Sequence, residues 1–422
     1  MPIIYMHGVN TRTPSHFAPV KEYLRRIVAP AIAPDPENVS IRAADWFQFC
    51  PPPKWGGISR PRTAFRAQGA AEAPRNEVLD SLASKLPKAP SAPRAGGLTS
   101  GQVTSPAQNT RIDTLPDEEL ADLIALSIRP PPEDGKIETE AESIERARIG
   151  AAADRVAQDR EIRQRLAAAP DLDAQLKIVA DAVQKDVEAM SGLSGQGAVG
   201  DFFRGMRDRV TESISRVGSA PAAGLTVVAS ELRPTLNDFA TRFIGDVLYY
   251  MKGRGKADAP GAIPSVLLKE IDLAHINKKE RGGEPIVLLT HSMGGQIAYD
   301  VISSFLPASG NSAKVDFWCA TASQVGFFEE LNMFLASSVD YSKATGRRMP
   351  LATSNLGHWW NLWDSNDIIS FTTKGIFADG IDDEEFWSGM SVAAAHGGYL
   401  ERPSFYRLFA EKLSAAFPDR TA

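Results

Sequence analysis

Short apolar runs and amphipathic segments alternate over the first 50 residues of the chain. Ile3–Met6 is apolar throughout and predicts a strand, and the spacing of apolar residues over 17–28 predicts a helix. Alternation over 39–46 predicts a second strand, which three prolines at 51–53 bring to an end. The chain therefore begins with a predicted strand–helix–strand unit.

The same rhythm returns after Gly282 and Gly283. A continuous apolar run over 285–290 is typical of a strand in a parallel sheet, where both faces are covered. Further strands are predicted at Val315–Thr321 and 359–363, with helical segments between and after them. Together the two ends of the chain predict an α/β fold with a doubly wound, mostly parallel sheet.

The middle of the chain, residues 51–235, has a different composition. Residues 86–110 are rich in Pro, Ala, Ser, Gly and Thr, so we expect an irregular linker over about 51–115. From about 116 to 235 we expect helices, because apolar residues recur at three- or four-residue spacing in Leu172, Leu176, Val179, Val183 and Val187. Residues 51–235 are thus predicted to be an insertion into a core made of 1–50 and 236–422.

A second apolar stripe follows on a predicted helix at the start of the C-terminal core. Its members are Leu236, Phe239, Phe243, Ile244, Val247, Leu248 and Met251. We expect this stripe to pack against the sheet, because such stripes usually face a core, and a lid or interfacial role is the alternative.

Composition and charge narrow the classes of function. Hydrophobic residues make up 43% of the 422 residues and charged residues 23%, as in globular proteins. The formal net charge of -6 provides no basic field that would gather phosphates, so we expect no nucleic-acid partner. No run approaches the roughly 18 apolar residues that cross a bilayer, so we expect no transmembrane segment and leave contact with a membrane surface open.

The two cysteines and the N-terminal sequence indicate the cellular compartment in which the protein is expected. Cys50 and Cys319 suggest neither a disulfide framework nor a thiolate metal site. The chain enters its first strand without the basic and apolar segments of a signal peptide. We therefore expect a cytoplasmic protein.

The junction between the predicted strand at 285–290 and the following helix carries the first candidate for chemistry. Its residues are Thr290, His291, Ser292, Met293, Gly294 and Gly295. A tight turn at such a junction lifts a serine hydroxyl above the sheet, and the helix N-terminus favours an oxyanion there. Ser292 is therefore the candidate nucleophile, although Thr290 stands where the usual pattern has its first glycine.

The loop after the first strand offers a second oxyanion donor. His7, Gly8 and Val9 follow Met6 directly, and Gly8 permits a close approach of backbone to the reacting group. We expect the backbone N–H groups of Val9 and Met293 to form the oxyanion hole. His7 is expected to shape this loop rather than to transfer protons.

The base and the acid of a triad should follow the nucleophile in the chain. His396, in a glycine-flanked loop before the last helix, is the expected base, whereas His358 stands beside a predicted aromatic strand. Asp367 is the expected acid, with Asp364 as the alternative. His291, next to the nucleophile, and His275, on a charged helix face, are discounted.

These motifs together resemble the lipase/esterase branch of the α/β hydrolases, over about residues 1–50 and 236–417. The resemblance implies hydrolysis of a carboxylic ester by a Ser-His-Asp triad, with an acyl-enzyme at Ser292 and no metal or organic cofactor. Thr321, Ala322 and Ser323 stand where relatives carry Thr-Gly-Ser at a strand end.

Other readings of the same residues remain open. The triad would also serve a thioesterase or a peptidase, and the fold could instead be the scaffold of a non-catalytic interaction protein. The substrate is expected to be a small-molecule or lipid ester. Because the insertion leaves the sheet at the carboxyl end of a strand, we expect parts of 51–235 to cap the pocket, with a partner-binding arm as the alternative.

Overall fold

The computed structural model describes residues 1–422 except 10, 12, 53, 55–76, 87–109, 131–137, 192–197, 220–232, 391–394 and 419–422. The chain forms two compact units. The first comprises Met1–Gln68, Gly224–Leu400 and Phe409–Ala422, and the second comprises Gly69–Ala223 and Glu401–Leu408. The sequence predicted boundaries between residues 50 and 51 and between residues 235 and 236. It did not predict that the short segment Glu401–Leu408 belongs to the second unit.

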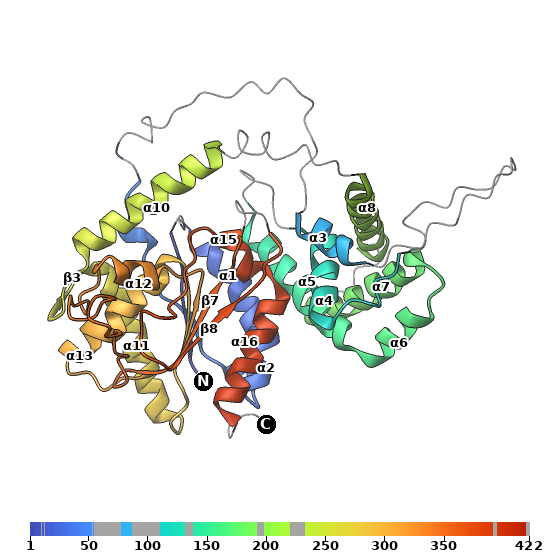
Figure 1. Cartoon of the computed structure of the whole chain (residues 1–422). Coiled ribbons are helices and arrows are strands. Elements are labelled where there is room, and N and C mark those ends of the chain that lie inside the picture. Colours follow the sequence, from blue (N-terminus) through green and yellow to red (C-terminus); the bar gives the residue numbers. More distant parts are fainter. Residues whose placement is uncertain are drawn as a thin grey trace, which may run out of the picture. The chain divides into compact units, whose positions relative to one another are not determined.

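A six-stranded sheet forms the centre of the first unit (Figure 1). Its strands all run parallel in the order β2-β1-β5-β6-β7-β8. The strands are β1 (Ile3–Met6), β2 (Ile41–Ala43), β5 (Val287–His291), β6 (Val315–Thr321), β7 (Leu356–Trp363) and β8 (Ile381–Glu385). The prediction of an α/β fold with a parallel sheet is therefore confirmed.

Helices cover both faces of this sheet. Figure 1 shows α11, α12 and α13 on one side and α1 and α2 on the other. The helical elements that follow the strands are α1 (Phe17–Tyr23), η2 (Leu24–Val28), α2 (Ala29–Ile32), α11 (Ala262–Glu280), α12 (Met293–Asp300), η6 (Val301–Phe305), α13 (Leu306–Ala308), α14 (Val325–Glu330), α15 (Ala395–Gly398) and α16 (Pro403–Ala416). Because both faces are covered, β5 is apolar over 287–289 and buried up to Thr290.

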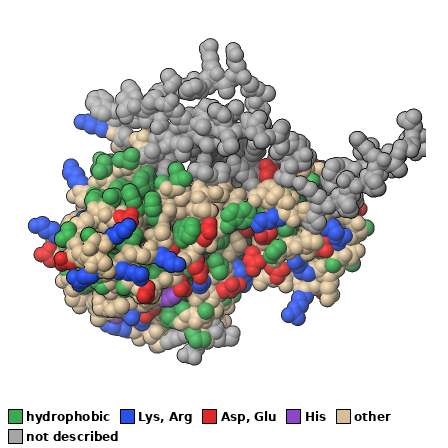
Figure 2. All heavy atoms as spheres, in the orientation of Figure 1, with side chains coloured by type: hydrophobic (Ala, Val, Ile, Leu, Met, Phe, Trp, Pro, Cys, Tyr) green, Lys and Arg blue, Asp and Glu red, His purple; other side chains and the backbone are tan. Residues whose placement is uncertain are grey.

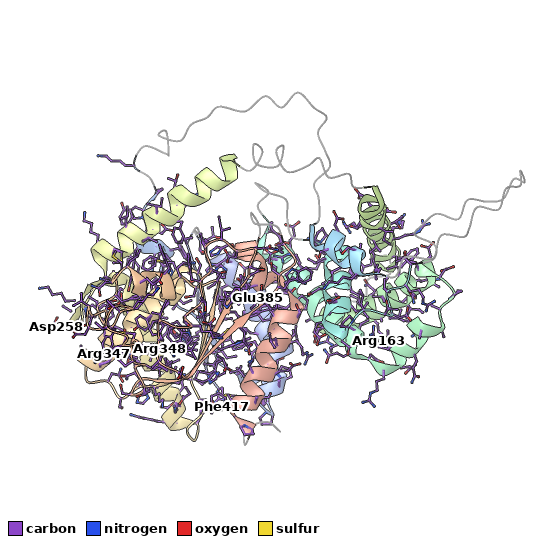
Figure 3. All side chains as sticks on the ribbon, viewed as in Figure 1. Arg163, Asp258, Arg347, Arg348, Glu385 and Phe417 are labelled. Atoms are coloured by element: carbon purple, nitrogen blue, oxygen red, sulfur yellow. The ribbon has the colours of Figure 1, made fainter. Side chains whose placement is uncertain are left out.

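The edge strand β8 is one that the sequence pattern did not predict. Its residues Ile381–Glu385 are mostly acidic, so they carry no apolar strand pattern. An edge strand meets solvent, so carboxylates fit there once they have partners: the Trp360 indole donates to Glu384 at 2.9 Å, and the Thr373 hydroxyl donates to Asp383 at 2.8 Å. Figure 3 labels Glu385, the last residue of this strand.

The second unit is helical. Its described helices are α3 (Glu77–Lys85), α4 (Asp117–Ile128), α5 (Glu140–Gln158), α6 (Arg160–Ala168), α7 (Leu172–Ser191) and α8 (Ala198–Ser219). The predicted stripe is buried at Leu172, Leu176, Val179 and Val183, as a core-facing stripe should be. The expectation of an irregular segment is wrong at α3, whereas most of the Pro- and Ala-rich stretch 86–110 lies outside the described residues.

Helix α10 (Arg233–Gly253), in the first unit, departs from the expected packing. Val247 and Met251 pack against the core, but Ile244 is 56% exposed and Leu248 62% exposed. The expectation that the whole stripe faces the sheet is therefore wrong for these two residues. The side chains of Leu236 and Phe239 lie outside the described residues.

The surface carries both signs of charge. On the face shown in Figure 2, acidic and basic side chains are interspersed and do not gather by sign.

Figure 3 labels three charged residues of the first unit. Asp258 lies in the turn of the small hairpin between β3 (Gly255–Lys256) and β4 (Ala259–Pro260). Arg347 and Arg348 lie between β6 and β7. Among the described helices, none combines the length and apolar character needed to cross a membrane.

Candidate active site

The turn between β5 and α12 holds Ser292 in an unusual backbone conformation. Its φ is 52° and its ψ is -128°, a region that L-residues rarely adopt. Two hydrogen bonds fix this conformation: the Ser292 amide donates to the Thr321 carbonyl at 2.9 Å, and the Gly295 amide donates to the Ser292 carbonyl at 2.8 Å. The strained turn places Ser292 between the carboxyl end of a strand and the first turn of a helix.

Two glycines make room for this turn. A Cβ on Gly294 would lie 2.6 Å from the Met6 carbonyl oxygen, so β1 could not approach α12 as it does. A Cβ on Gly8 would lie 2.6 Å from the Cβ of Ser292. Both distances are far below van der Waals contact, so the approach of the His7–Gly8 loop to Ser292 requires glycine at both positions.

Thr290 occupies the place of the first glycine without obstructing the turn. It is fully buried, and its hydroxyl accepts a hydrogen bond from the Trp318 indole at 2.9 Å. Its carbonyl accepts from the Thr321 hydroxyl at 3.0 Å. The side chain is thus held by partners on β6, the neighbouring strand.

Ser292, His396 and Asp367 form a continuous chain of hydrogen bonds. His396 Nε2 lies 2.8 Å from Ser292 Oγ, and His396 Nδ1 lies 2.9 Å and 3.1 Å from the two oxygens of Asp367. Because the carboxylate accepts from Nδ1–H, Nε2 presents its lone pair to the serine hydroxyl. The structure therefore brings together the three residues selected from the sequence, which come from the turn after β5, from α15 and from the loop after β7.

Asp364 and Asp367 have different partners, although they belong to one loop. One oxygen of Asp364 accepts from the Asn366 amide and the other from the Ser388 amide, both at 2.8 Å. Asp364 therefore shapes the loop through backbone contacts. The carboxylate of Asp367 is the one that faces His396.

His291, the last residue of β5, contacts His396 directly. Its Nε2 lies 2.7 Å from the His396 carbonyl oxygen, and the residue is partly buried. Burial, followed by repulsion from His396, lowers the pKa of His291 to about 4. The ring is therefore neutral at pH 7 and donates its N–H to His396. His291 was not expected to be a base, and its contact with the His396 backbone has no signal in the sequence.

The loop after β1 is held by His7 and Trp46. His7 Nδ1 lies 2.8 Å from the Gly8 carbonyl, its Nε2 accepts from the Trp46 amide at 3.2 Å, and the Trp46 indole donates to the His7 carbonyl at 2.8 Å. His7 thus shapes the loop through its partners. Val9 follows Gly8, and Met293 is the first residue of α12, where an amide has no acceptor within its own helix.

The remaining histidines discussed above lie elsewhere. His358, on β7, pairs with Asp382 at 3.2 Å at the edge of the sheet. His275 is on α11, near Lys278 and Lys279. Among the described residues, neither forms a hydrogen bond or an ion pair with Ser292.

Burial sets the electrostatics of the site. Ser292 is 0% exposed and Asp367 3% exposed, and the His396 side chain is 13% exposed. Charges that interact in such an enclosed place are screened less than at a surface.

Comparison with models of known families, with curated proteins and with solved structures finds no match to this chain. The function must therefore be argued from the residues of the site.

Proposed function

We propose that this protein is a serine hydrolase that cleaves a carboxylic ester through an acyl-enzyme. The observation that carries the proposal is the hydrogen-bond chain from Ser292 Oγ through His396 to Asp367. The strained turn at Ser292 adds support, because backbone strain persists where the surrounding structure enforces it and is frequent at active sites.

The chemistry follows from the properties of these groups. Ser292 Oγ attacks the ester carbonyl carbon while His396 Nε2 takes the hydroxyl proton, and Asp367 stabilises the imidazolium that results. The carbonyl oxygen becomes an oxyanion, which the amides of Met293 and Val9 would receive, and each such donor contributes about 3 to 4 kcal/mol. His396 then gives its proton to the departing alkoxide, which leaves as an alcohol.

Water completes the cycle in the same geometry. His396 takes a proton from water, the hydroxide attacks the acyl carbon, and the returned proton releases Ser292 together with the carboxylic acid. Because Ser292 exposes no surface, substrate can reach it only when the residues that cover it move. The hypothesis that parts of 51–235 form that cover stays a prediction.

Covalent labelling tests the proposal directly. A fluorophosphonate probe should label the full chain at Ser292, and Ser292→Ala should lose both labelling and ester turnover. Ser303→Ala is a matched control, because the Ser303 hydroxyl donates to the Tyr299 carbonyl and has no part in the site. A folded wild-type protein that does not label, or a Ser292→Ala variant that retains turnover, would overturn the proposal.

A substrate panel tests the finer assignment. Graded p-nitrophenyl esters, thioesters and peptide anilides should be compared by kcat/KM, and we expect the esters to be fastest. Labelling at Ser292 together with preference for a thioester or an anilide would retain the hydrolase and reject the ester. Absence of labelling together with a protein partner that binds through 51–235 would favour the non-catalytic reading.

A further inference from the structure

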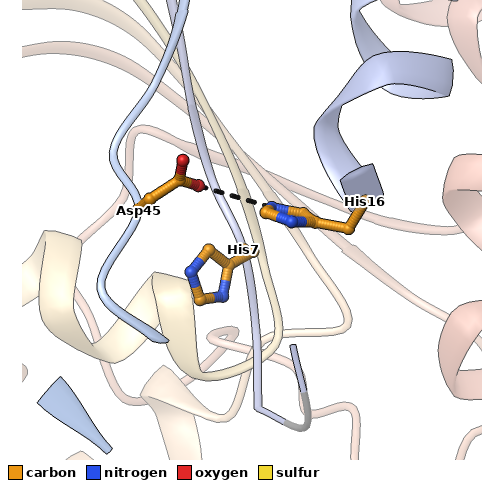
Figure 4. Close-up of side chains that lie close together, drawn as sticks. All are labelled: His7, His16 and Asp45. Carbon is orange, nitrogen blue, oxygen red and sulfur yellow. Dashed lines mark ion pairs between the residues drawn. The ribbon is translucent and has the colours of Figure 1, made fainter. Parts of the chain in front are cut away.

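Three side chains with metal-binding chemistry converge beside the first two strands. They are His7, at the end of β1, His16, just before α1, and Asp45, after β2 (Figure 4). One ligand atom of each lies within 4.8 Å of the others. All three belong to the first unit and lie near the carboxyl ends of neighbouring parallel strands, the edge at which ligands bind in such sheets.

His16 and Asp45 face each other with acceptor atoms. His16 Nδ1 lies 2.6 Å from the Thr13 carbonyl oxygen, so Nδ1 carries the hydrogen and Nε2 bears a lone pair. That Nε2 lies 3.6 Å from Asp45 Oδ1, beyond hydrogen-bond distance. Both atoms are buried and have no hydrogen-bond partner among the described residues. Two unpartnered acceptors at this distance leave room for a cation that both could bind.

His7 has the same arrangement of its ring nitrogens. Its Nδ1 lies 2.8 Å from the Gly8 carbonyl oxygen, which leaves the lone pair on Nε2, and this atom accepts a long hydrogen bond from the Trp46 amide at 3.2 Å. A histidine whose outer N–H is held by a backbone carbonyl is oriented as metal-ligating histidines are. Ligation through Nε2 would replace the bond from Trp46.

We propose that His7, His16 and Asp45 bind a divalent transition-metal ion of the zinc class, through His7 Nε2, His16 Nε2 and Asp45 Oδ1. Two imidazoles and a carboxylate are a donor set that such ions prefer, and a fourth position is left for water. Metal–ligand bonds of about 2.0–2.1 Å at tetrahedral angles place two ligand atoms roughly 3.4 Å apart. The separation of 3.6 Å between His16 and Asp45 is close to this value.

Aromatic rings wall the site. Trp46 stacks on His7, with ring centroids 5.0 Å apart and ring planes at 7°. The ring centroid of Phe47 lies 5.8 Å from that of His7 and 6.4 Å from that of His16. The two imidazole rings are 4.8 Å apart. An apolar wall of this kind limits water and strengthens the attraction between a carboxylate and a cation.

The site has a structural consequence for the catalytic loop. Its ligands come from three different segments, and His7 immediately precedes Gly8, which contacts Ser292. A bound ion would join these segments and hold the loop that carries Val9. We therefore expect the ion to raise the melting temperature, whether or not Ser292 is reactive.

Zinc titration of the full chain tests the proposal. After removal of metal by a chelator, the wild-type protein should bind one equivalent of Zn²⁺ by calorimetry, and Co²⁺ should give a d–d absorption band. His16→Ala and Asp45→Asn should each weaken Zn²⁺ binding at least tenfold. His358→Ala is the matched control, because His358 and Asp382 form a half-exposed pair at 3.2 Å, and its affinity for Zn²⁺ should equal that of the wild type.

The outcomes separate this site from the proposed hydrolase. Ser292→Ala should bind Zn²⁺ as the wild type does, so failure of labelling at Ser292 leaves this test unaffected. Absence of Zn²⁺ and Co²⁺ binding by the wild type, or equal binding by the folded Asp45→Asn variant, would overturn the proposal. Asp45→Asn preserves side-chain volume, so it decides the matter if His16→Ala does not fold, as judged by circular dichroism.

Discussion

The two aspartates of the loop after β7 differ in what their oxygens accept. Asp367 accepts from His396 Nδ1, whereas both oxygens of Asp364 are taken by the amides of Asn366 and Ser388. A carboxylate on Nδ1 selects the tautomer in which Nε2 can accept the serine proton. Hydrogen-bond partners therefore distinguish Asp367, which orients His396, from Asp364, which holds the loop. Their positions in the sequence do not.

This difference predicts different effects of equivalent substitutions. Asp367→Asn should lower kcat for ester hydrolysis by about 10⁴-fold, because an amide does not hold the required tautomer. Asp364→Asn should retain kcat to within roughly tenfold, because it changes a loop contact and leaves the triad intact. Steady-state kinetics on folded variants measure both effects, and a larger loss in Asp364→Asn would assign the acid to the other residue.

His291 predicts a dependence of stability on pH. Burial lowers its pKa to about 4, below the ordinary value of about 6.5 in an unfolded chain. Between these two pH values the unfolded chain binds a proton that the folded protein does not. The contribution of His291 to the free energy of unfolding is therefore complete above about pH 6.5. It is lost as the pH falls toward 4, by about 3 kcal/mol in all. The groups that face the ring are His396 and Asp367.

His291→Gln should reduce that acid loss. Gln retains an N–H that can reach the His396 carbonyl but does not titrate, so the free energy of unfolding should fall less between pH 6.5 and 4 than in the wild type. Urea unfolding at several pH values measures this difference. A slope in His291→Gln equal to that of the wild type would contradict the assignment.

At the scale of elements, the end of β6 stores backbone strain at Ala322. Its φ is 52°, in the left-handed region that favours glycine, and its amide donates to the Leu362 carbonyl at 3.0 Å. A glycine would adopt this conformation without a steric penalty, whereas the Cβ of Ala322 is strained there.

Ala322→Gly should therefore cost less stability than Ala320→Gly. Both side chains are fully buried, so each variant loses a buried methyl group, about 0.8 kcal/mol, and adds freedom to the unfolded chain, about 0.5–1 kcal/mol. Only Ala322→Gly also relieves strain, of about 1–2 kcal/mol, so we expect it to be more stable than Ala320→Gly by about that amount. Denaturant midpoints compare the two variants, and equal midpoints would show that Ala322 is not strained.

Elements were easiest to predict where one physical pattern dominated. β5 and β6 are apolar because helices cover both faces, so their sequences alone indicated buried strands. β8 was missed because an edge strand can carry acidic residues whose partners, such as Lys412, come from distant segments. Helix α3 was missed because its surroundings in sequence are rich in residues that favour irregular chain.

At the scale of the whole molecule, the helical unit holds a buried ion pair that no sequence pattern indicates. Arg402 and Asp122 are 2% and 1% exposed, and Arg402 Nε donates to Asp122 Oδ2 at 2.8 Å. The Ser404 hydroxyl donates to the same oxygen at 2.8 Å. This pair joins Glu401–Leu408 to α4 within the second unit.

Asp122→Ala should destabilise the second unit by about 3–5 kcal/mol, because it leaves a buried guanidinium without its anion. Asp173→Ala removes an exposed pair with Arg207, both more than half exposed, and should cost less than about 1 kcal/mol. Hydrogen exchange in α4 and α5 measures the effect. Equal protection of the α4 and α5 amides from exchange in the two variants would show that the buried pair contributes no more to stability than the exposed pair.

The sequence by itself determined the alternation of strands and helices, the parallel sheet and the order of candidate residues, because these depend on local periodicity and on neighbouring residues. Tertiary structure decided which aspartate meets His396, why Thr290 is tolerated and how His291 is partnered. It also brought His7, His16 and Asp45 together, although the sequence analysis expected no metal cluster. Their spacing in the chain carries no zinc pattern, because contacts made by parallel strands join segments that are distant in sequence.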